Sequence, residues 1–324
     1  FALRAEKPLW IGALRARLPP CDRPFEGYVR HMGGRAEVKI SRTIWWDGDF
    51  VAWEDATVHV LSHSLQRGSL IFDYMSVHET SRGAAIFRLR EHVERLFASA
   101  ELVGLQLDRG VEEIEAAIME TVRRNPGATA VKVSAFLPSI EIDVVPSDTR
   151  VALAIAAYDP VTDIQAAKPG GVQPRRASAR LWIEKTVKNR RLDILAPQAK
   201  VAANYTSTML AKWKARADGY DEILLIDENG CVAEGPTSNV FLVDREGTVV
   251  TPSEENVLLG VTRRTILDLA EAEGIPVREG RVTPEDLLVA REVFLTGTTA
   301  GVWPVESIDG KPVAEDVPGP VAVQ

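Results

Sequence analysis

In the stretch AKVAANYTSTML, residues 199–210, Lys200 is followed by small residues, then by Asn204-Tyr205 and a run with helical character. We expect that run to form a helix from about Thr206 to Ala217. Most lysines of a globular protein are solvated surface charges. A catalytic role for Lys200 is therefore indicated only if other parts of the chain supply groups that could act together with its amine.

The composition is that of an ordinary globular protein. The chain has 324 residues, of which 45% are hydrophobic and 26% are charged, with a formal net charge of −8. This length allows a large core and favours two domains. The mildly acidic balance argues against binding to a phosphate backbone, and no apolar run approaches the roughly 18 residues that cross a bilayer. We expect no nucleic-acid or membrane partner.

The sequence lacks the common motifs of several enzyme classes. Cys21 and Cys231 are the only cysteines, which favours a reducing compartment, and the segment 1–20 lacks a continuous apolar core of the signal-peptide type. We therefore expect a cytoplasmic protein. No H-E-x-x-H, G-x-S-x-G, G-x-G-x-x-G or P-loop motif is present. We accordingly expect no metal site and no ordinary nucleotide cradle.

The periodicity divides the chain into two halves of mixed strands and helices. TIWWDGDFVAW (43–53), with the turn signal Asp47-Gly48, predicts a hairpin. Further strands are expected at 83–89, 128–137 and 150–158, and helices at 90–105 and 110–125. The breakers in DPVTDIQAAKPGGVQP (159–174) predict a linker. The expected organisation is an N-terminal extension (1–40), a small domain (41–160), a linker (161–172) and a large domain (173–324).

The second half predicts the same mixture. Strands are expected at 222–226, 231–235, 238–243 and 248–252, and a helix at 260–274. The stretch 292–305 is expected to be a strand that enters a Gly/Thr turn. Such a mixture of strands and helices indicates an α/β or α+β protein.

Three other segments could serve Lys200. Glu234 lies at the end of a predicted strand, Gly260-Val261-Thr262 opens a helix, and TGTTAG (296–301) forms a Gly/Thr turn. The first turn of a helix presents free N–H groups to anions, although Thr262 could instead cap its helix and Glu234 could be solvated. A lysine, a carboxylate and a phosphate cradle are together what pyridoxal 5'-phosphate (PLP) requires.

Six motifs in order make the chain resemble a known family. From about Ile44 to Val305 it resembles the class IV (fold type IV) aminotransferases, which include branched-chain aminotransferases, D-amino-acid transaminases, (R)-selective amine transaminases and aminodeoxychorismate lyase. This resemblance implies a small N-terminal α/β domain and a larger C-terminal pseudo-barrel α/β domain. The motifs are WWDGDFVAWEDATVHVLSHSLQRG, FRLREHVERLFASAELVG, AKVAANYTSTMLAKWKARADGYDEILLID, VAEGPTSNVFLV, LLGVTRRTILDLAEAEGI and FLTGTTAGVWPVESIDG.

The resemblance implies a role for each matching residue. Lys200 matches the lysine that forms a Schiff base with PLP, and neither Lys185 nor Lys188 is followed by an Asn-Tyr pair. Tyr205 matches the tyrosine at the phenolic oxygen, and Glu234 the carboxylate at the pyridine nitrogen. Arg95, Val261, Thr262 and Thr298 match the phosphate cradle, and Thr299 and Ala300 the turn facing the substrate carboxylate.

The stretch RGSLIFDYMS, residues 67–76, departs from the branched-chain pattern YGxxxFEGIR. Arg67 replaces a tyrosine, Asp73-Tyr74 replaces Glu-Gly, and Ser76 replaces an arginine. We interpret the stretch as a substrate loop with a changed pocket, in which Arg67 at the mouth, Phe72 and Tyr74 contact substrate. The turn TTAGVWP is similar to that of (R)-selective amine transaminases.

These observations predict a PLP-dependent transaminase with ping-pong chemistry. The expected substrates are an amino acid or (R)-primary amine and a 2-keto acid. The alternatives are a strict branched-chain L-amino-acid aminotransferase, an aminodeoxychorismate lyase-like enzyme, and a protein that keeps the fold without catalysis. The resemblance also implies a homodimer.

Overall fold

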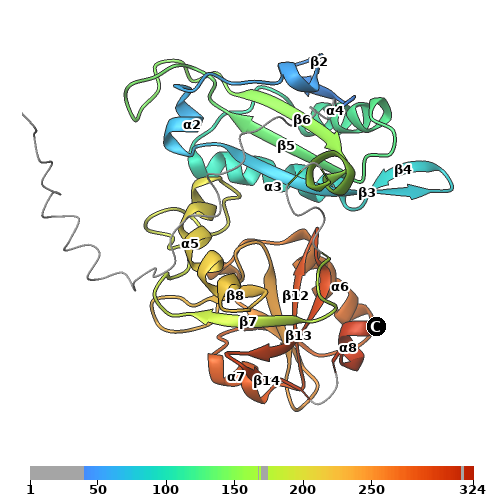
Figure 1. The fold of residues 1–324 in the computed structure, drawn as a ribbon, viewed down its shortest axis with the longest axis vertical. Coiled ribbons are helices and arrows are strands. Elements are labelled where there is room, and N and C mark those ends of the chain that lie inside the picture. The colour runs from blue at the N-terminus through green and yellow to red at the C-terminus, as the bar shows by residue number, and fades with distance from the viewer. Residues whose placement is uncertain (1–39, 167, 169–173, 315–316) are drawn as a thin grey trace, which may run out of the picture. The chain divides into compact units, whose positions relative to one another are not determined.

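Two β-sheets organise the part of the chain that this computed structural model describes, residues 40–166, 168, 174–314 and 317–324 (Figure 1). The first sheet has six strands in the order β2-β1-β6-β5-β3-β4, and the second has eight, with β11-β10-β9-β12-β13-β7-β8 on its main path and β14 paired to β13. The strands of the first sheet are β1 (Thr43–Trp46), β2 (Asp49–Ala52), β3 (Ile71–Thr80), β4 (Gly83–Ile86), β5 (Ala130–Phe136) and β6 (Ala152–Tyr158).

The first sheet is hydrophobic on one face. Its buried rows, such as Val131, Val133 and Ala135 on β5, pack against helices α3 (Leu89–Val103) and α4 (Val111–Arg124) in one core. The predicted hairpin forms between β1 and β2, with Asp47 and Gly48 at positive φ. Both predicted helices of this half are confirmed within about two residues.

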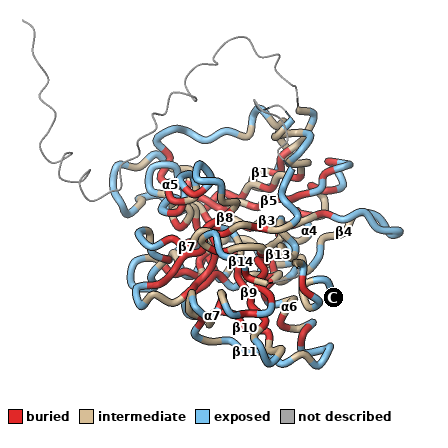
Figure 2. The backbone as a smooth tube through the Cα atoms, turned by 60° about the horizontal axis from the view of Figure 1, so that its bottom comes forward, coloured by how far each residue is buried: buried red, intermediate tan, exposed pale blue. Residues whose placement is uncertain are grey.

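Residues 71–80 form a strand, so the prediction of a substrate loop over 67–76 is wrong for most of its length. Helix α2 (His63–Arg67) ends at Gly68, and β3 then pairs with β5 and β4. Side chains of β3 alternate: Ile71, Asp73 and Met75 are buried, while Phe72 and Tyr74 lie on the opposite face. Figure 2 shows the buried strand continuing into an exposed hairpin with β4.

The second sheet is buried along most of its strands. Its members are β7 (Ala179–Glu184), β8 (Glu222–Leu225), β9 (Asn239–Val243), β10 (Val249–Pro252), β11 (Val277–Gly280), β12 (Glu292–Gly297), β13 (Gly301–Ile308) and β14 (Lys311–Pro312). Near-continuous burial, as in β9 and β10, is typical of strands covered on both faces. The expected strand at 231–235 is reduced to isolated bridges at Val232 and Glu234.

Helices in this half follow the apolar pattern. Helix α5 (Ala203–Ala217) begins three residues before the predicted Thr206 and packs Ala211 and Ala215 against β8. Helix α6 (Val261–Ala272) packs Leu267 against β9 and β12. The shorter helices are α7 (Pro284–Val289) and α8 (Pro320–Val323). Within the described residues, none of the helices is long and apolar enough to cross a membrane.

The predicted linker 161–172 is described only in part. Residues Pro160–Gln165 form a π-helix whose N-terminus is capped by the Asp159 side chain, which accepts from the N–H groups of Val161 and Thr162. Residues 167 and 169–173 of the linker lie outside the described residues, as does all of the expected N-terminal extension except Ile40. The domain boundaries therefore stay a prediction.

Candidate active site

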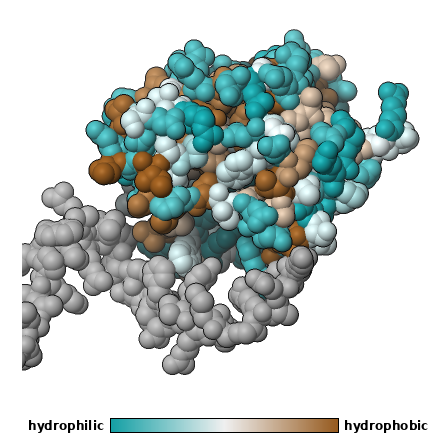
Figure 3. All heavy atoms as spheres, turned by 90° about the horizontal axis from the view of Figure 1, so that it is seen from above, coloured by the Kyte–Doolittle hydropathy of each residue, from teal (hydrophilic) through white to brown (hydrophobic). Residues whose placement is uncertain are grey.

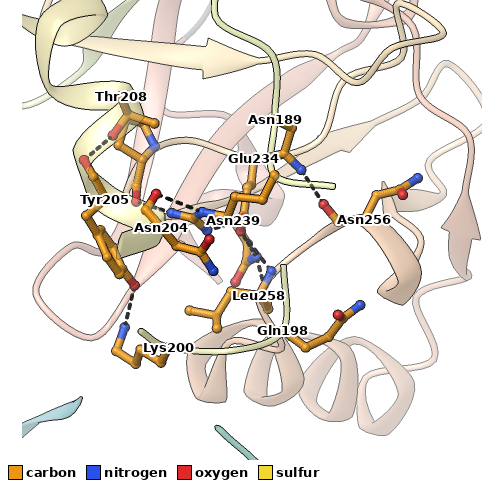
Figure 4. Close-up of polar contacts among 12 residues, drawn as sticks. Asn189, Gln198, Lys200, Asn204, Tyr205, Thr208, Glu234, Asn239, Asn256 and Leu258 are labelled. Atoms are coloured by element: carbon orange, nitrogen blue, oxygen red, sulfur yellow. Dashed lines mark hydrogen bonds and ion pairs between the residues drawn. The ribbon is translucent and has the colours of Figure 1, made fainter. Parts of the chain in front are cut away.

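Lys200 lies in a short segment that runs beside the start of β3 and leads into helix α5. Its backbone carbonyl accepts a hydrogen bond from the Phe72 N–H at 3.0 Å, and its N–H donates to Ser99 Oγ at 3.0 Å. Five residues on, in the first turn of α5, Tyr205 places its hydroxyl 3.3 Å from Lys200 Nζ (Figure 4). The hydrogen bonds of its backbone N–H and carbonyl groups therefore fix the position of Lys200 relative to Tyr205.

The surroundings favour the neutral amine of Lys200. Burial, and secondarily the positive charge of Arg95, lower the pKa of Lys200 to about 7. Burial also raises the pKa of Tyr205 to about 12, so its hydroxyl keeps its proton at neutral pH. A lysine with this pKa can act as a nucleophile and as a base near neutrality.

Glu234 is buried between three partners. Its Oε1 accepts from Arg190 Nη1 at 2.6 Å, and its Oε2 accepts from the Leu258 N–H at 3.1 Å and from Asn239 Nδ2 at 3.2 Å (Figure 4). Burial raises the pKa of Glu234, and the charge of Arg190 opposes that shift. The carboxylate is thus held in one orientation by a charged partner and two neutral donors.

Arg190 was missed by the sequence reasoning. Its Nε donates to the Asn204 carbonyl at 3.2 Å, and its guanidinium carbon lies 4.9 Å from the centre of the Tyr205 ring. One arginine therefore joins Glu234 to the first turn of α5. The run EKTVKNRR contains it, but a basic run of this kind is equally typical of a solvated surface.

Arg95 is held by a buried acid. Its Nε and Nη2 donate to Asp73 Oδ2 and Oδ1, both at 2.9 Å, and His92 Nδ1 lies 2.7 Å from Oδ1. Burial opposes ionisation of Asp73, but Arg95 and His92 outweigh it and hold the pKa of Asp73 well below its usual range. This cluster explains why an acid is tolerated in the buried row of β3, since a paired charge with satisfied oxygens can be buried.

We expect Asp73→Asn to lower the free energy of unfolding by about 3 kcal/mol, because it leaves the Arg95 charge in a buried site without its counterion. Asp268 is the control: it pairs with Arg88 at 2.7 Å but keeps 33% of its side chain exposed. Asp268→Asn should cost less than about 1 kcal/mol. Urea unfolding of both variants tests this, and equal losses would contradict it.

The start of helix α6 faces the same place. Gly260 is its N-cap and Val261 its first residue, and no side chain among the described residues caps it, so Thr262 does not have the capping role considered above. Arg95 Nη1 donates to the Leu259 carbonyl at 3.2 Å, which brings the guanidinium beside this helix start. A side chain at position 260 would overlap the Asn239 side chain, so glycine permits this close approach.

A small cavity lies between these groups. Ser238 and Thr296 are among the residues that line it, and their hydroxyl oxygens are buried and have no hydrogen-bond partner within the described residues. Unpaired buried hydroxyls beside a free helix N-terminus and an arginine fit a phosphate. The residues that line the cavity are Arg95, Arg190, Lys200, Glu234, Pro236, Thr237, Ser238, Asn239, Leu258, Gly260, Val261, Thr262, Thr296, Gly297 and Thr298.

A larger cavity of about 790 Å³ also borders Lys200. This volume lies within the range of small-molecule sites. Burial raises the pKa of Tyr74, on its wall, to about 12, which keeps that phenol neutral. The site residues expected from the sequence that line this cavity are Phe72, Tyr74, Lys200, Tyr205, Thr298, Thr299 and Ala300.

Arg67 is the one expected site residue that does not line either cavity. It is exposed at the end of α2, where its Nη2 donates to the Ile142 carbonyl at 2.7 Å. The expectation that Arg67 lies at the pocket mouth therefore finds no support within this chain. Every other expected residue borders one cavity or both, although the roles of these residues remain predictions.

Comparisons with known proteins identify the class. Residues 70–308 match the family model "Amino-transferase class IV". The branched-chain-amino-acid aminotransferase of Pseudomonas aeruginosa is 35% identical over 280 residues, 86% of this chain and 88% of that protein. That of Escherichia coli K12 is 36% identical over 284 residues, with the same coverage. The fold and the site thus define a PLP-dependent enzyme.

Solved structures agree with this class. The crystal structure of the Escherichia coli branched-chain amino acid aminotransferase superposes with a TM-score of 0.79 at 31% identity, over 88% of this chain and 92% of that one. A thermophilic archaeal enzyme, the branched-chain aminotransferase of Thermoproteus uzoniensis with norvaline, gives 0.78 at 31% identity, over 87% and 91%. The chain belongs to the class IV aminotransferases, a family that uses PLP to move an amino group between an amino acid and a keto acid.

The residues present fit this cofactor. Arg95, the start of α6 and the unpaired hydroxyls of Ser238 and Thr296 would hold the phosphate, and Glu234 would hold the proton on the pyridine nitrogen. Lys200 would supply the amine that binds the aldehyde. When bound, PLP supplies an electron sink that stabilises negative charge on the substrate carbon.

Proposed function

We propose that the enzyme transfers the amino group of branched-chain L-amino acids to a 2-keto acid by ping-pong chemistry. The similarity to branched-chain-amino-acid aminotransferases over 86% of the chain carries this proposal, and it favours branched-chain donors over the (R)-amines expected from the turn TTAGVWP. Phe72, Tyr74 and Trp303 give the larger cavity aromatic walls that suit an aliphatic side chain.

The residues divide the chemistry among themselves. With PLP bound, Lys200 would be the base that moves a proton to and from the substrate carbon, a role for which a pKa of about 7 is suited. Glu234, supported by Arg190, keeps the pyridine nitrogen protonated. Tyr205 keeps its proton and would donate it to the phenolic oxygen of PLP. Arg95 and the start of α6 anchor the phosphate, so the reacting atoms stay in register with Lys200.

A panel of amino donors tests the assignment. The visible spectrum of the PLP-loaded enzyme should change fastest with L-leucine, and more slowly with (R)-1-phenylethylamine, its (S) enantiomer and D-alanine. An enzyme that turns over the (R)-amine but not L-leucine would refute branched-chain specificity and support the second candidate, an (R)-amine transaminase, which Tyr74 favours by changing the wall of the larger cavity. Pyruvate release from aminodeoxychorismate without any acceptor would instead indicate the lyase.

We propose that the enzyme is a homodimer. Ile140, Ile142, Val144 and Val145 are all exposed, with Ile142 96% exposed, on a loop that is tied to α2 by the contact of His63 Nε2 with the Val144 carbonyl at 2.8 Å. Hydrophobic residues also interrupt the hydrophilic surface on the face seen in Figure 3. Clustered exposed apolar residues are typical of an interface. Sedimentation equilibrium should give twice the chain mass, and a monomer at micromolar concentration would contradict the proposal.

A further inference from the structure

The groups assigned to the phosphate come from two helices that pack on different sheets. Arg95 lies on α3, which packs in the core of the first sheet. The N–H groups of Val261 and Thr262 begin α6, which packs against β9 and β12 of the second sheet. Both sets of groups can reach one phosphate only if the two helices are held at the right distance, so the contacts between α3 and α6 bear directly on cofactor binding.

Arg88 joins these two helices. It is the N-cap of α3, and its Nη2 donates to Oδ2 of Asp268 on α6 at 2.7 Å. At the phosphate end, Arg95 Nη1 donates to the carbonyl of Leu259, just before α6, at 3.2 Å. Arg95 follows Arg88 by seven positions, and Asp268 follows Val261 by seven positions. Seven residues make about two helical turns, or about 10 Å, so the Arg88–Asp268 pair restrains both helices at a point two turns from the phosphate site.

The backbone of Arg88 has a conformation that arginine rarely adopts. Its φ of 53° and ψ of 46° are those of the left-handed helical region. Among the described residues other than glycine, it shares a positive φ only with Asp47 and Asp309. Glycine and asparagine adopt this conformation at a lower cost, and asparagine is also the better N-cap. The backbone therefore does not explain an arginine at this position, which indicates that its side chain is needed.

The ion pair of Arg88 is set among other charges. Arg88 Nη1 lies 3.7 Å from Glu91 Oε1, and Asp268 Oδ1 accepts from Arg264 Nε at 2.8 Å. Each of these neighbours lies on the same helix as the residue it contacts, so of the three ion pairs it is Arg88–Asp268 that joins α3 to α6. The two side chains are 23% and 33% exposed. An ion pair with this exposure adds little to folding, so alignment of the helices is the larger effect to expect from it.

We propose that Arg88 and Asp268 are positioning residues that hold α6 beside α3 and so assemble the phosphate site before PLP binds. This inference rests on the proposed cofactor arrangement, in which Arg95 and the start of α6 anchor the phosphate. Neither Arg88 nor Asp268 lines the small cavity, so both act through the groups that do. A site that is assembled in advance binds its ligand more tightly, because less conformational freedom is lost on binding.

Arg90 provides the matched control variant. It lies in the first turn of the same helix, and it pairs with Glu112 and Glu115 of α4 at 2.8 and 3.0 Å. Helices α3 and α4 both pack on the first sheet. Breaking this cluster therefore removes a partly exposed ion pair of α3 and leaves the contact between α3 and α6 intact. Pyridoxal, which lacks the phosphate, is the matched control ligand.

The test measures the binding of PLP and of pyridoxal to the cofactor-free wild type and to Arg88→Asn, Asp268→Asn, their double variant and Arg90→Asn. Arg88→Asn and Asp268→Asn should each weaken PLP binding by about three- to fivefold, the upper part of the range for a partly exposed ion pair, and change pyridoxal binding by less than about 1.5-fold. The double variant should lose no more than either single variant, because the two residues act as one pair. Arg90→Asn should change neither ligand by more than about 1.5-fold.

Two further measurements separate positioning from folding. Asparagine relieves the backbone strain at position 88, so the urea midpoint of cofactor-free Arg88→Asn should equal or exceed that of the wild type while its PLP affinity falls. At saturating PLP, the rate of the L-leucine half-reaction in Arg88→Asn should stay within about twofold of the wild-type rate, because the reacting groups are unchanged.

Four results would overturn the role of this pair: unchanged PLP affinity in Arg88→Asn, an equal weakening of PLP and pyridoxal binding, losses that multiply in the double variant, or a loss of the same size in Arg90→Asn. A wild-type enzyme that binds PLP and transfers amino groups, with variants that bind PLP equally well, refutes only this inference. A wild-type protein that binds no PLP refutes the proposed function itself.

Discussion

Replacing Lys200 with alanine is expected to abolish amino-group transfer, with the rate of the L-leucine half-reaction falling by at least about 10⁴-fold. General base catalysis alone accounts for about 10²- to 10⁴-fold, and loss of covalent attachment adds to it. Tyr205, 3.3 Å away, is no substitute, because its pKa of about 12 prevents it from acting as a base near neutral pH.

Lys200→Ala should still bind PLP, because Arg95 and the start of α6 do not depend on the lysine. Its visible band should move to that of the free aldehyde. Lys185→Ala is the control, since Lys185 is exposed and pairs with Asp309 at 3.5 Å, and it should retain wild-type activity. More than about 1% residual activity in Lys200→Ala, or a loss of similar size in Lys185→Ala, would contradict the assignment of the base.

Local signals predicted most of the fold. The turn at Asp47-Gly48 and the apolar stripes of α3 and α4 depend only on residues close in sequence, and the structure contains them at the expected places. Strand β3 was missed because Asp73 interrupts its apolar row. Asp73 can be buried in this row because it pairs with Arg95, which lies 22 positions away in the sequence. No local sequence pattern links the two residues.

Site residues that belong to a sequence motif were predicted. Site residues that are recognised only by contacts with residues distant in the sequence were missed. Lys200, Glu234 and Thr262 came from motifs, and the structure places all three around one small cavity. Arg190 has no such signal, because it looks like an ordinary surface cation until its partner Glu234 is seen in three dimensions. Arg67 shows the opposite error, in which a motif position suggested a contact that this chain alone does not make.

Replacing Glu234 with glutamine is expected to reduce activity by about 10²- to 10⁴-fold and to destabilise the protein. Glutamine keeps the shape but cannot hold a positive charge on the pyridine nitrogen, so the electron sink is weakened. It also leaves Arg190, which lies 2.6 Å from the carboxylate and is 5% exposed in its side chain, without a counterion. Removing one partner of a buried pair costs about 3–5 kcal/mol of unfolding free energy.

A double variant separates the two effects. Arg190→Met/Glu234→Gln removes both charges, so the free energy of unfolding should recover most of the loss seen in Glu234→Gln. Activity should not recover, because the negative charge at the nitrogen is still missing. Urea unfolding of the cofactor-free protein and the rate of the L-leucine half-reaction measure the two quantities. Recovery of activity together with stability would mean that Glu234 serves only to neutralise Arg190, and the assigned role at the cofactor ring would then be wrong.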